Sequence, residues 1–301
     1  PREKQRRAEL RLAFENNAPV VGDVRHIHSV LAICGLPHSR QPLDVRDYER
    51  RQGNMAISVE AGKLMTPTGE WQKVPLPFGP KARLILMYLC SEAVKQKTPT
   101  IEIADTFTAF VKELKFSDSG GPRGALTAFR EQLNALAACT IRMASWSPDR
   151  VKTKTFSPIE EFDLWLSSDP RQKSLWPSKV TFSAPMFESL QRHAVPVNFN
   201  AVRAFSGSSR KLDLYFWLGY RLYNVEAPTA ISWQSLSDQF GVGFQRERKF
   251  RELFARELAH IAEVFPKLGA RLTDNGLLLQ PTGPEALALP ALKPRKRRPT
   301  A

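Results

Sequence analysis

The chain has 301 residues, and 42% of them are hydrophobic, so it is long and apolar enough to bury a core and is not wholly disordered. Lys and Arg number 44 against 30 Asp and Glu, a formal net charge of +14 that favours a polyanionic partner: DNA, RNA or an acidic membrane surface. The longest strongly apolar run, Leu84–Cys90, is far shorter than the roughly 20 residues of a transmembrane helix, so no membrane-spanning helix is expected.

The cysteines and the N-terminus add two further expectations. The three cysteines are widely spaced without a C-x-x-C pair, which argues against a zinc site or a disulfide framework. No apolar stretch follows the charged segment Pro1–Arg7, so no secretory signal is visible. We therefore expect a cytoplasmic protein without a metal or a cofactor.

Residues 1–75 are predicted to form an irregular, partly disordered N-terminal extension. Residues 1–18 are rich in Arg and Glu, which fits a solvated helix or an arm. Helical signals are few in the segment that follows, although Met55–Val59 alternates like a strand after a turn at Arg51–Asn54.

Residues 76–190 show the pattern of three helices followed by strands. Pro80 suits the first position of a helix that runs to about Lys97, and the short strand Thr100–Ile103 follows. Asp105 or Thr106 can cap a second helix. Pro122 then opens a third helix that ends near Cys139, and the strand-like segments after it are Thr140–Trp146, Phe162–Leu166 and Lys179–Ser183.

The same order is predicted again in residues 191–284. A helix over Arg210–Asn224 precedes a short helix, Trp233–Phe240, and a long helix from about Gln245 to Phe265. Asn275-Gly276 then marks a β-hairpin turn, because Asn-Gly readily adopts positive φ. Residues 285–301 are predicted to be a disordered basic tail.

Helix, short helix, long helix and hairpin is the order of a winged helix-turn-helix domain. The predicted fold class is therefore α+β and mainly helical, with two tandem winged helix-turn-helix domains, residues 76–190 and 191–284, and the irregular N-terminal extension. A linker is expected at roughly Pro185–Ser208. Helical repeat proteins also contain tandem helix-turn-helix units, but they have no wing.

The helix from Pro122 to Cys139 is the first candidate for reading DNA. Its apolar residues lie three and four apart, and the opposite side carries Arg123, Thr127, Arg130 and Asn134. Arg123 can pair bidentately with guanine, and Asn134 with adenine. The alternative is an ordinary amphipathic helix with a solvated polar face.

The second candidate is the start of the long helix near Gln245. Cations at a helix N-terminus oppose the macrodipole, and a DNA phosphate or base would offset that cost. The alternative is solvation together with pairing to Glu247 and Glu252. The candidate DNA-binding residues here are Gln245, Arg246, Arg248, Lys249, Arg251 and Arg256.

A catalytic alternative rests on His26, His28 and Tyr48. Nicking enzymes of rolling-circle replication and conjugation use a His-hydrophobic-His triplet to bind a divalent metal and a tyrosine to attack the phosphodiester. No acidic metal partner lies close by in an obvious strand, and surface or capping histidines are the simpler interpretation. No P-loop, nucleophile elbow or H-E-x-x-H motif is present. We therefore expect a protein that is not an enzyme.

Ten short segments between residues 25 and 285, taken in order, resemble the RepA-type replication initiators of bacterial plasmids. They are Cys34–Pro37, Tyr48–Gly53, Ile57–Gly62, Leu76–Leu86, Gly120–Gly124, Arg130–Leu133, Ile231–Leu236, Gln239–Gly241, Phe250–Phe254 and Gly276–Pro281.

The resemblance implies a bacterial protein that binds repeats (iterons) in double-stranded DNA at a plasmid origin and recruits host initiator and helicase proteins. Related initiators also repress their own promoter as dimers, so a homodimer is possible. A winged-helix transcriptional repressor is the alternative with the same DNA contacts. RNA binding is less favoured, because no aromatic-rich stacking motif is present.

Overall fold

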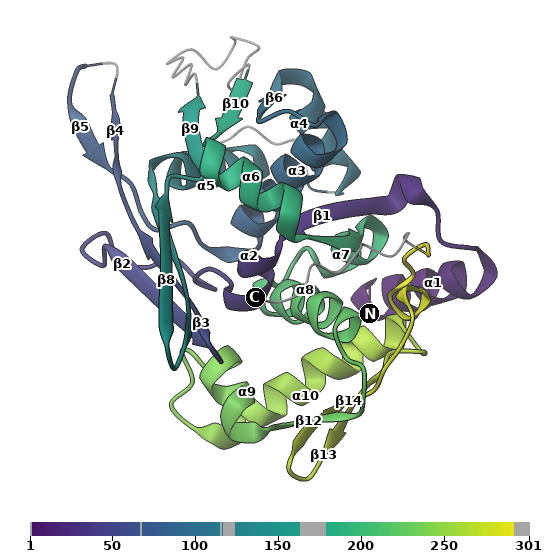
Figure 1. Ribbon diagram of the computed structural model, residues 1–301. Coiled ribbons are helices and arrows are strands. Elements are labelled where there is room, and N and C mark those ends of the chain that lie inside the picture. Colours follow the sequence, from purple (N-terminus) through teal and green to yellow (C-terminus); the bar gives the residue numbers. More distant parts are fainter. Residues whose placement is uncertain (1, 67, 115, 117–123, 163–178, 292–301) are drawn as a thin grey trace.

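The computed structural model of the chain describes residues 2–66, 68–114, 116, 124–162 and 179–291. Helices take up more of these residues than strands do, but the strands form five small antiparallel sheets among them (Figure 1). The fold is therefore mixed α/β, and the prediction of a mainly helical chain understates the strands.

The first part of the chain contributes helices and strands before residue 183. They are α1 (Arg2–Asn16), β1 (Val24–His28), α2 (Ser29–Cys34), β2 (Asp47–Gln52), β3 (Met55–Glu60), β4 (Lys63–Met65), β5 (Trp71–Lys73), α3 (Gly79–Gln96), β6 (Thr100–Glu102), α4 (Ala104–Glu113), α5 (Ala125–Ala138), β7 (Thr140–Ser147), β8 (Arg150–Phe156), β9 (Ile159–Phe162) and β10 (Lys179–Phe182). A 3-10 turn, η1 (Val21–Asp23), precedes β1.

The second part contributes the remaining elements. They are α6 (Ala184–His193), β11 (Ala194–Asn198), α7 (Phe199–Phe205), α8 (Ser209–Tyr223), β12 (Thr229–Ser232), α9 (Trp233–Phe240), α10 (Glu247–Val264), β13 (Ala270–Thr273), β14 (Gly276–Leu279) and the 3-10 turn η2 (Pro284–Leu287).

Two units of the chain share one element order: a helix, a strand, two helices and two strands. The first unit is α3, β6, α4, α5, β9 and β10, and the second unit is α8, β12, α9, α10, β13 and β14. In both units the last strand in sequence lies in the middle of a three-stranded sheet, with the orders β6-β10-β9 and β12-β14-β13. The order predicted twice from the sequence is thus present twice in the described residues.

The first unit differs from the second by an inserted hairpin. Strands β7 and β8 come between α5 and β9. They belong to a separate four-stranded sheet of order β2-β3-β7-β8, in which β7 pairs with β3. The predicted turn between β2 and β3 is confirmed at Gly53 and Asn54, where Gly53 has φ +51°. Glycine is suited to this position because it has no Cβ to clash at positive φ.

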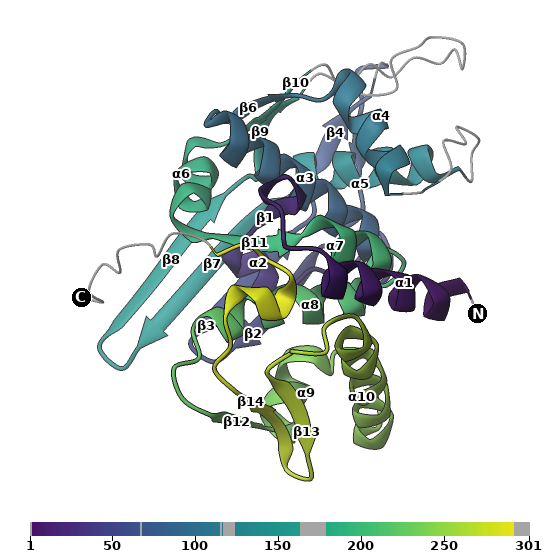
Figure 2. The same ribbon diagram turned by 90° about the vertical axis from the view of Figure 1, so that its right-hand side faces the viewer.

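The core forms where the leading helices of the two units meet. Every residue of the runs Leu84–Cys90 in α3 and Leu212–Leu218 in α8 is buried, and the two helices contact each other. A helix that buries residues all round its circumference lies inside a protein rather than on its surface. Figure 2 shows β1, β11, α7 and α8 stacked across this centre.

The expected linker at Pro185–Ser208 is wrong, because this segment holds two helices and a strand. Strand β11 pairs antiparallel with β1, with His26 opposite Pro196. Helix α7 is capped by Asn198, whose side chain accepts from the backbone N–H groups of Asn200 and Ala201. A strand of five residues that contains a proline gives a weak signal by itself, and its partner lies about 170 residues away in sequence.

The N-terminal extension is also more ordered than predicted. Helix α1 packs on α10, where Arg7 Nε donates to Glu263 at 2.6 Å and the rings of Phe14 and Phe265 stack at 5.4 Å. Strands β1 and β3 and helix α2 supply buried residues to the common core, and Tyr48 of β2 packs against that core half-buried.

The start of the predicted disordered tail is ordered as well. Residues 284–287 form η2, and Leu287 and Leu289 are buried. The side chain of Asn198 donates to the carbonyl of Ala288 at 2.8 Å, which fastens this segment to the core. The basic run Lys293–Arg298 lies outside the described residues.

Candidate nucleic-acid interface

Helix α10 is held by an aromatic cluster that fixes which of its faces is free. Phe250 and Phe254 are buried, and the ring of Trp233 at the start of α9 meets them edge-on at 6.4 and 6.0 Å. Phe240 packs on Phe254 at 5.6 Å, and Phe244 on Phe250 at 5.7 Å. This packing anchors α9 and the connecting turn against one side of α10 and leaves the opposite side towards solvent.

All six residues predicted from the start of the long helix lie on this free side or just before it. We call them the α10 basic surface: Gln245, Arg246, Arg248, Lys249, Arg251 and Arg256, all exposed. The side chain of Arg248 is 89% accessible and that of Lys249 is 68% accessible. The structure thus brings these residues together on a surface that a ligand can reach.

The pairing with Glu247 and Glu252 that the sequence allowed is also present. Arg248 Nε lies 2.9 Å and Lys249 Nζ 3.1 Å from Glu252, and Arg251 lies 2.5 Å from Glu247. Hydrogen bonds from Lys249 and Arg248 lower the pKa of Glu252, so this carboxylate stays charged. Exposed ion pairs at this helical spacing are weak, so a phosphate can displace them. Four cations against two acids leave the first turns positive.

The hairpin β13–β14 is tied to the start of α9. Trp233 donates its indole Nε1–H to the carbonyl of Asp274 at 3.0 Å, and its backbone N–H to that of Asn275 at 3.1 Å. The guanidinium of Arg251 lies over the Trp233 ring, 5.1 Å from its centre. The hairpin turn, α9 and α10 therefore form one connected surface.

Arg271 on β13 is exposed, and it is a cation of this hairpin that the sequence analysis did not single out. A single arginine in a predicted hairpin carries no signal without its neighbours in space.

Helix α5 in the first unit is more covered. Thr127, Arg130 and Asn134 fall along one side of the helix and are half-buried, and Arg123 lies outside the described residues. The side-chain oxygen of Asn134 is buried without a hydrogen-bond partner among the described residues. The acceptor half of the Asn134 amide is therefore not open to solvent, whereas an asparagine that pairs with adenine uses both the acceptor and the donor. The role of these four residues stays a prediction.

The histidine triplet is not arranged as a metal site. His28 is buried; its Nδ1 accepts from the backbone N–H of Val30 at 3.2 Å, and its Nε2 lies 3.0 Å from Ser189 Oγ. Both ring nitrogens are therefore engaged, and burial lowers the pKa of His28 to about 3. Tyr48 lies on β2, within 3.5 Å of the guanidinium of Arg50. Among the described residues, no three His, Cys, Asp or Glu side chains come together as metal ligands.

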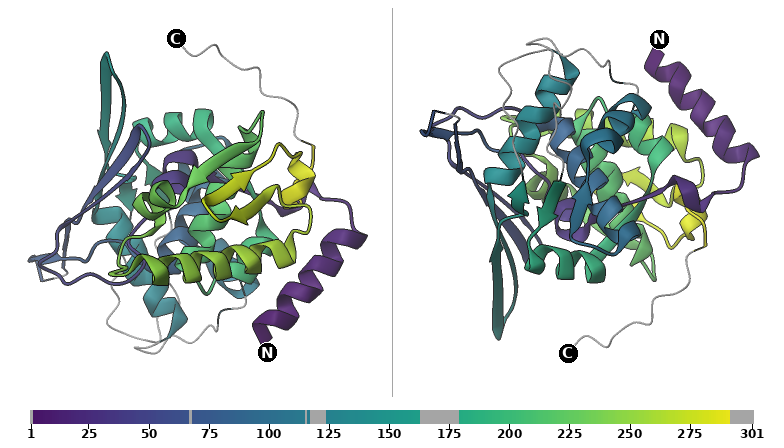
Figure 3. Two further views of the ribbon diagram at one scale, coloured as in Figure 1. Left: turned by 90° about the horizontal axis from the view of Figure 1, so that it is seen from below. Right: turned by 90° about the horizontal axis from the view of Figure 1, so that it is seen from above.

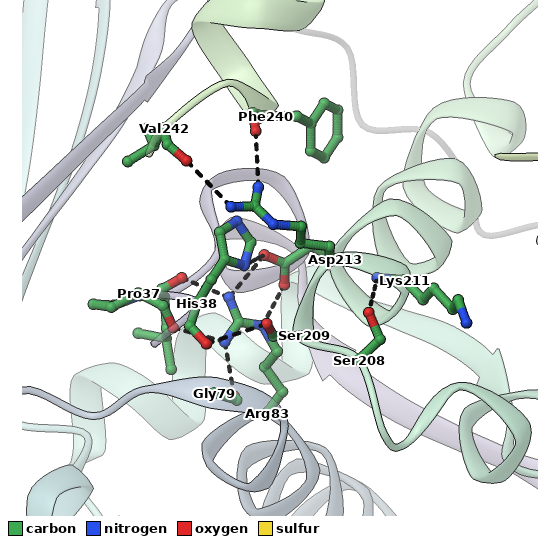
Figure 4. A network of polar contacts seen from close by, with 12 residues as sticks. Pro37, His38, Gly79, Arg83, Ser208, Ser209, Lys211, Asp213, Phe240 and Val242 are labelled. Atoms are coloured by element: carbon green, nitrogen blue, oxygen red, sulfur yellow. Dashed lines mark hydrogen bonds and ion pairs between the residues drawn. The ribbon is translucent and has the colours of Figure 1, made fainter. Parts of the chain in front are cut away.

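A buried network of charged side chains joins α3 of the first unit to α8 of the second unit (Figure 4). Arg83 of α3 donates two parallel hydrogen bonds to Asp213 of α8, at 2.5 and 2.7 Å. Its remaining donors reach the carbonyls of Leu36, Pro37 and Gly79. Burial raises the pKa of Asp213, but the contact with Arg83 outweighs it, so the net pKa is lowered.

Arg50 and His38 complete the network. Arg50 Nη1 lies 3.8 Å from Asp213 Oδ2, and its other terminal nitrogen donates to the carbonyl of Gln239 in α9. His38 is half-buried and lies close to the same carboxylate, with Nδ1 at 3.7 Å from Asp213 Oδ2. The network thus fastens α3, α8, β2 and α9 together and sets the position of the second unit against the first. Nothing in the local sequence marks Arg50, Arg83 or Asp213 as partners.

No helix in the described part of the chain is long and apolar enough to cross a membrane.

The chain has similarities to solved structures and to one protein family. No curated protein matches the chain. A selenomethionine crystal structure of domains 2 and 3 of RctB is similar, with a TM-score of 0.48, 13% identity, and coverage of 84% of this chain and 97% of that one. A second crystal structure of RctB domains 2 and 3 gives a TM-score of 0.47, 12% identity, and coverage of 83% and 94%. These scores are too low to transfer any property of RctB.

The sequence match is more specific. The family described as plasmid-encoded RepA protein (RepA_C) matches residues 76–235, more than half of the chain. This match begins just before α3 and ends within α9, so it covers the first unit and the start of the second. It confirms the resemblance drawn from the short segments, and the chain belongs to the family of plasmid-encoded RepA proteins.

Proposed function

We propose that this chain initiates plasmid DNA replication by binding repeated sequences at a plasmid origin. The observation that carries the proposal is the α10 basic surface: an exposed cationic face on the third helix of a unit, beside a hairpin tied to it through Trp233. Membership of the RepA family supports the plasmid replication role.

Each unit acts as a winged helix-turn-helix domain in this proposal. The order of helices and strands supports this assignment, with β13–β14 as the wing of the second unit and β9–β10 as the wing of the first. In such domains the third helix enters the major groove and its N-terminal residues touch base edges. That role falls to α10 and, in the first unit, to α5.

The chemistry of the α10 basic surface fits both parts of DNA recognition. Lys and Arg contacts to phosphates supply affinity that falls steeply with salt. Arg248 and Arg246 can also reach guanine edges, and Gln245 an adenine edge. Two units on one chain raise the effective concentration of the second unit once the first has bound, which favours closely spaced repeats.

The protein would act without catalysis of its own, in the bacterial cytoplasm, and would recruit host initiator and helicase proteins. A homodimer that represses its own promoter is part of the same proposal. Strand scission is disfavoured because both ring nitrogens of His28 are already bonded within the fold.

The test is a nuclease footprint on the DNA that flanks the encoding gene, at near-physiological salt and with Mg²⁺ present. Protection over a ladder of direct repeats without cleavage is the expected result. A single short palindromic footprint would instead identify a transcriptional repressor. A nick with protein attached to the 5′ end would overturn both and make Tyr48 the candidate nucleophile.

A further inference from the structure

The β7–β8 hairpin projects from the rest of the molecule. Its two strands are joined by the two-residue turn Pro148-Asp149, and Ser147 lies opposite Arg150. Strand β8 is the outer edge of the four-stranded sheet, so no further strand covers it among the described residues. Figures 2 and 3 show the hairpin standing clear of the helices.

One face of this hairpin carries three cations in a row. Side chains alternate along a strand, so Arg150, Lys152 and Lys154 share a face with the buried Phe156. Arg150 and Lys152 are exposed, and Lys154 is half-buried. Two residues of an antiparallel strand span about 6.8 Å, so the three charges form a ladder roughly 14 Å long. We call it the β8 cation ladder.

The ladder has no acidic partner within the described residues. The positions opposite Arg150, Lys152 and Lys154 on β7 are Ser147, Ser145 and Met143. The other face of the same sheet shows the usual arrangement, because Arg142 pairs there with Glu60 at 2.8 Å. Like charges in succession on one strand face repel each other, so the ladder costs stability in the free protein.

Lysines on an edge strand also prevent strands of different molecules from pairing, which is the simplest explanation of a charged edge. One inward-facing charge is enough for that purpose. Three successive cations are more than that purpose requires. Together with two serine hydroxyls opposite them, they form a row of hydrogen-bond donors whose spacing is comparable to that of successive phosphates along one DNA strand. Serine, lysine and arginine are among the side chains that contact DNA phosphates.

We propose that the β8 cation ladder binds the phosphate backbone of a DNA duplex as a second contact, separate from the α10 basic surface. The inference rests on the proposed function, because that function makes DNA the partner. In Figure 2 the hairpin tip, α9, α10 and β13 all lie on the lower side of the molecule, with the hairpin well apart from α10. A duplex that contacts α10 can therefore continue beneath the hairpin, and the ladder lengthens the bound segment without reading its bases.

The experiment compares two triple variants of the full chain with equal net charge. Arg150→Gln/Lys152→Gln/Lys154→Gln removes the ladder. The control, Arg51→Gln/Arg142→Gln/Lys95→Gln, removes three exposed cations, two of them on the outer face of the same sheet. Affinity is measured against salt concentration on the repeat DNA and on a random duplex, together with the length of the footprint.

The ladder variant is expected to lower the slope of log affinity against log salt by about 2 to 3, since each phosphate contact contributes roughly 0.9. It should shorten the footprint at one flank and keep the sequence preference. The control variant should keep the slope and the footprint of the wild-type protein. Equal behaviour of the two variants would overturn the inference.

Two further results keep the inference separate from the proposed function. If the wild-type protein shows no preference for repeats but the ladder variant still loses affinity for a random duplex, the ladder binds DNA and the origin-binding function is wrong. If the triple variant fails to fold, the single variant Lys152→Glu replaces it, because Lys152 is exposed. Unchanged salt dependence in Lys152→Glu would then overturn the inference.

Discussion

The two units have the same strand order, yet they differ in how much of the third helix they expose. In the second unit α10 keeps its cationic side open, with Arg248 among the most accessible side chains of the helix. In the first unit the predicted DNA-facing residues of α5 that the structure describes are half-buried, and Arg40 pairs with the half-buried Glu131 of α5 at 2.5 Å. The same topology thus leaves the third helix open on one side in the second unit and more enclosed in the first.

The two helices also differ in their neighbours. Helix α5 packs against α3, β9 and β4, whereas α10 is covered by α1, α8 and α9 on its inner side only. The β2–β3 and β4–β5 hairpins precede the first unit in sequence and have no counterpart before the second. The third helix of the first unit is therefore the more covered of the two.

The largest expected effect comes from breaking the joint between the units with Asp213→Ala. This change leaves Arg83 buried and unpaired, and uncompensated buried charges of this kind typically cost about 3–5 kcal/mol. Urea unfolding followed by circular dichroism measures the loss. The matched control is Arg142→Ala, which breaks an exposed pair with Glu60 and should cost under about 1 kcal/mol. Similar losses in the two variants would show that the buried network does not hold the units together.

Acid should destabilise the folded chain through two histidines, His28 and His38. Burial lowers the pKa of both His28 and His38 to about 3, and in His38 it outweighs the attraction of Asp213. The unfolded chain binds these protons below about pH 6.5, while the folded chain stays neutral down to about pH 3. Stability is therefore complete above about pH 6.5 and falls by up to about 1.4 kcal/mol per pH unit for each histidine as the pH drops to 3.

The measurement is the free energy of unfolding between pH 7 and pH 4. His28→Gln should make the free energy of unfolding depend less steeply on pH in this window, because one of the two histidines is gone. It also lowers the stability at pH 7. A slope that does not change in His28→Gln would contradict the assignment of His28 as a buried neutral group.

Local patterns predicted the elements well wherever a cap or a turn marks their ends. The long helix expected from Gln245 to Phe265 is present as Glu247–Val264, and the short helix Trp233–Phe240 matches residue for residue. Ser232 caps that short helix and Gly241 follows it, so both ends are specified by nearby residues. The grouping of the α10 basic surface was predictable for the same reason, because its residues are close together in sequence.

The features that sequence analysis missed all depend on partners far away along the chain. Strand β11 is recognisable only through its pairing with β1, and the burial of Arg50 only through Gln239 and Asp213. Strand β2 reads Asp-Tyr-Glu-Arg-Arg-Gln, which no hydrophobic alternation marks as a strand. Contacts of this kind arise from the packing of the two units, and no local propensity encodes them.

The smallest expected effect compares the two helices directly on DNA. Arg248→Ala should weaken binding to the origin repeats by about 1–3 kcal/mol, the range for an arginine that pairs with a guanine edge. Its ion pair with Glu252 is exposed, so stability should change by less than about 0.5 kcal/mol.

Arg130→Ala is the matched change in the first unit, where the side chain is half-buried on α5. Electrophoretic mobility shifts with wild-type and base-substituted repeats measure both variants. A larger loss of affinity in Arg130→Ala than in Arg248→Ala would reverse the roles proposed for the two helices. In that case α5 would read the bases despite its greater burial, and α10 would bind the phosphate backbone.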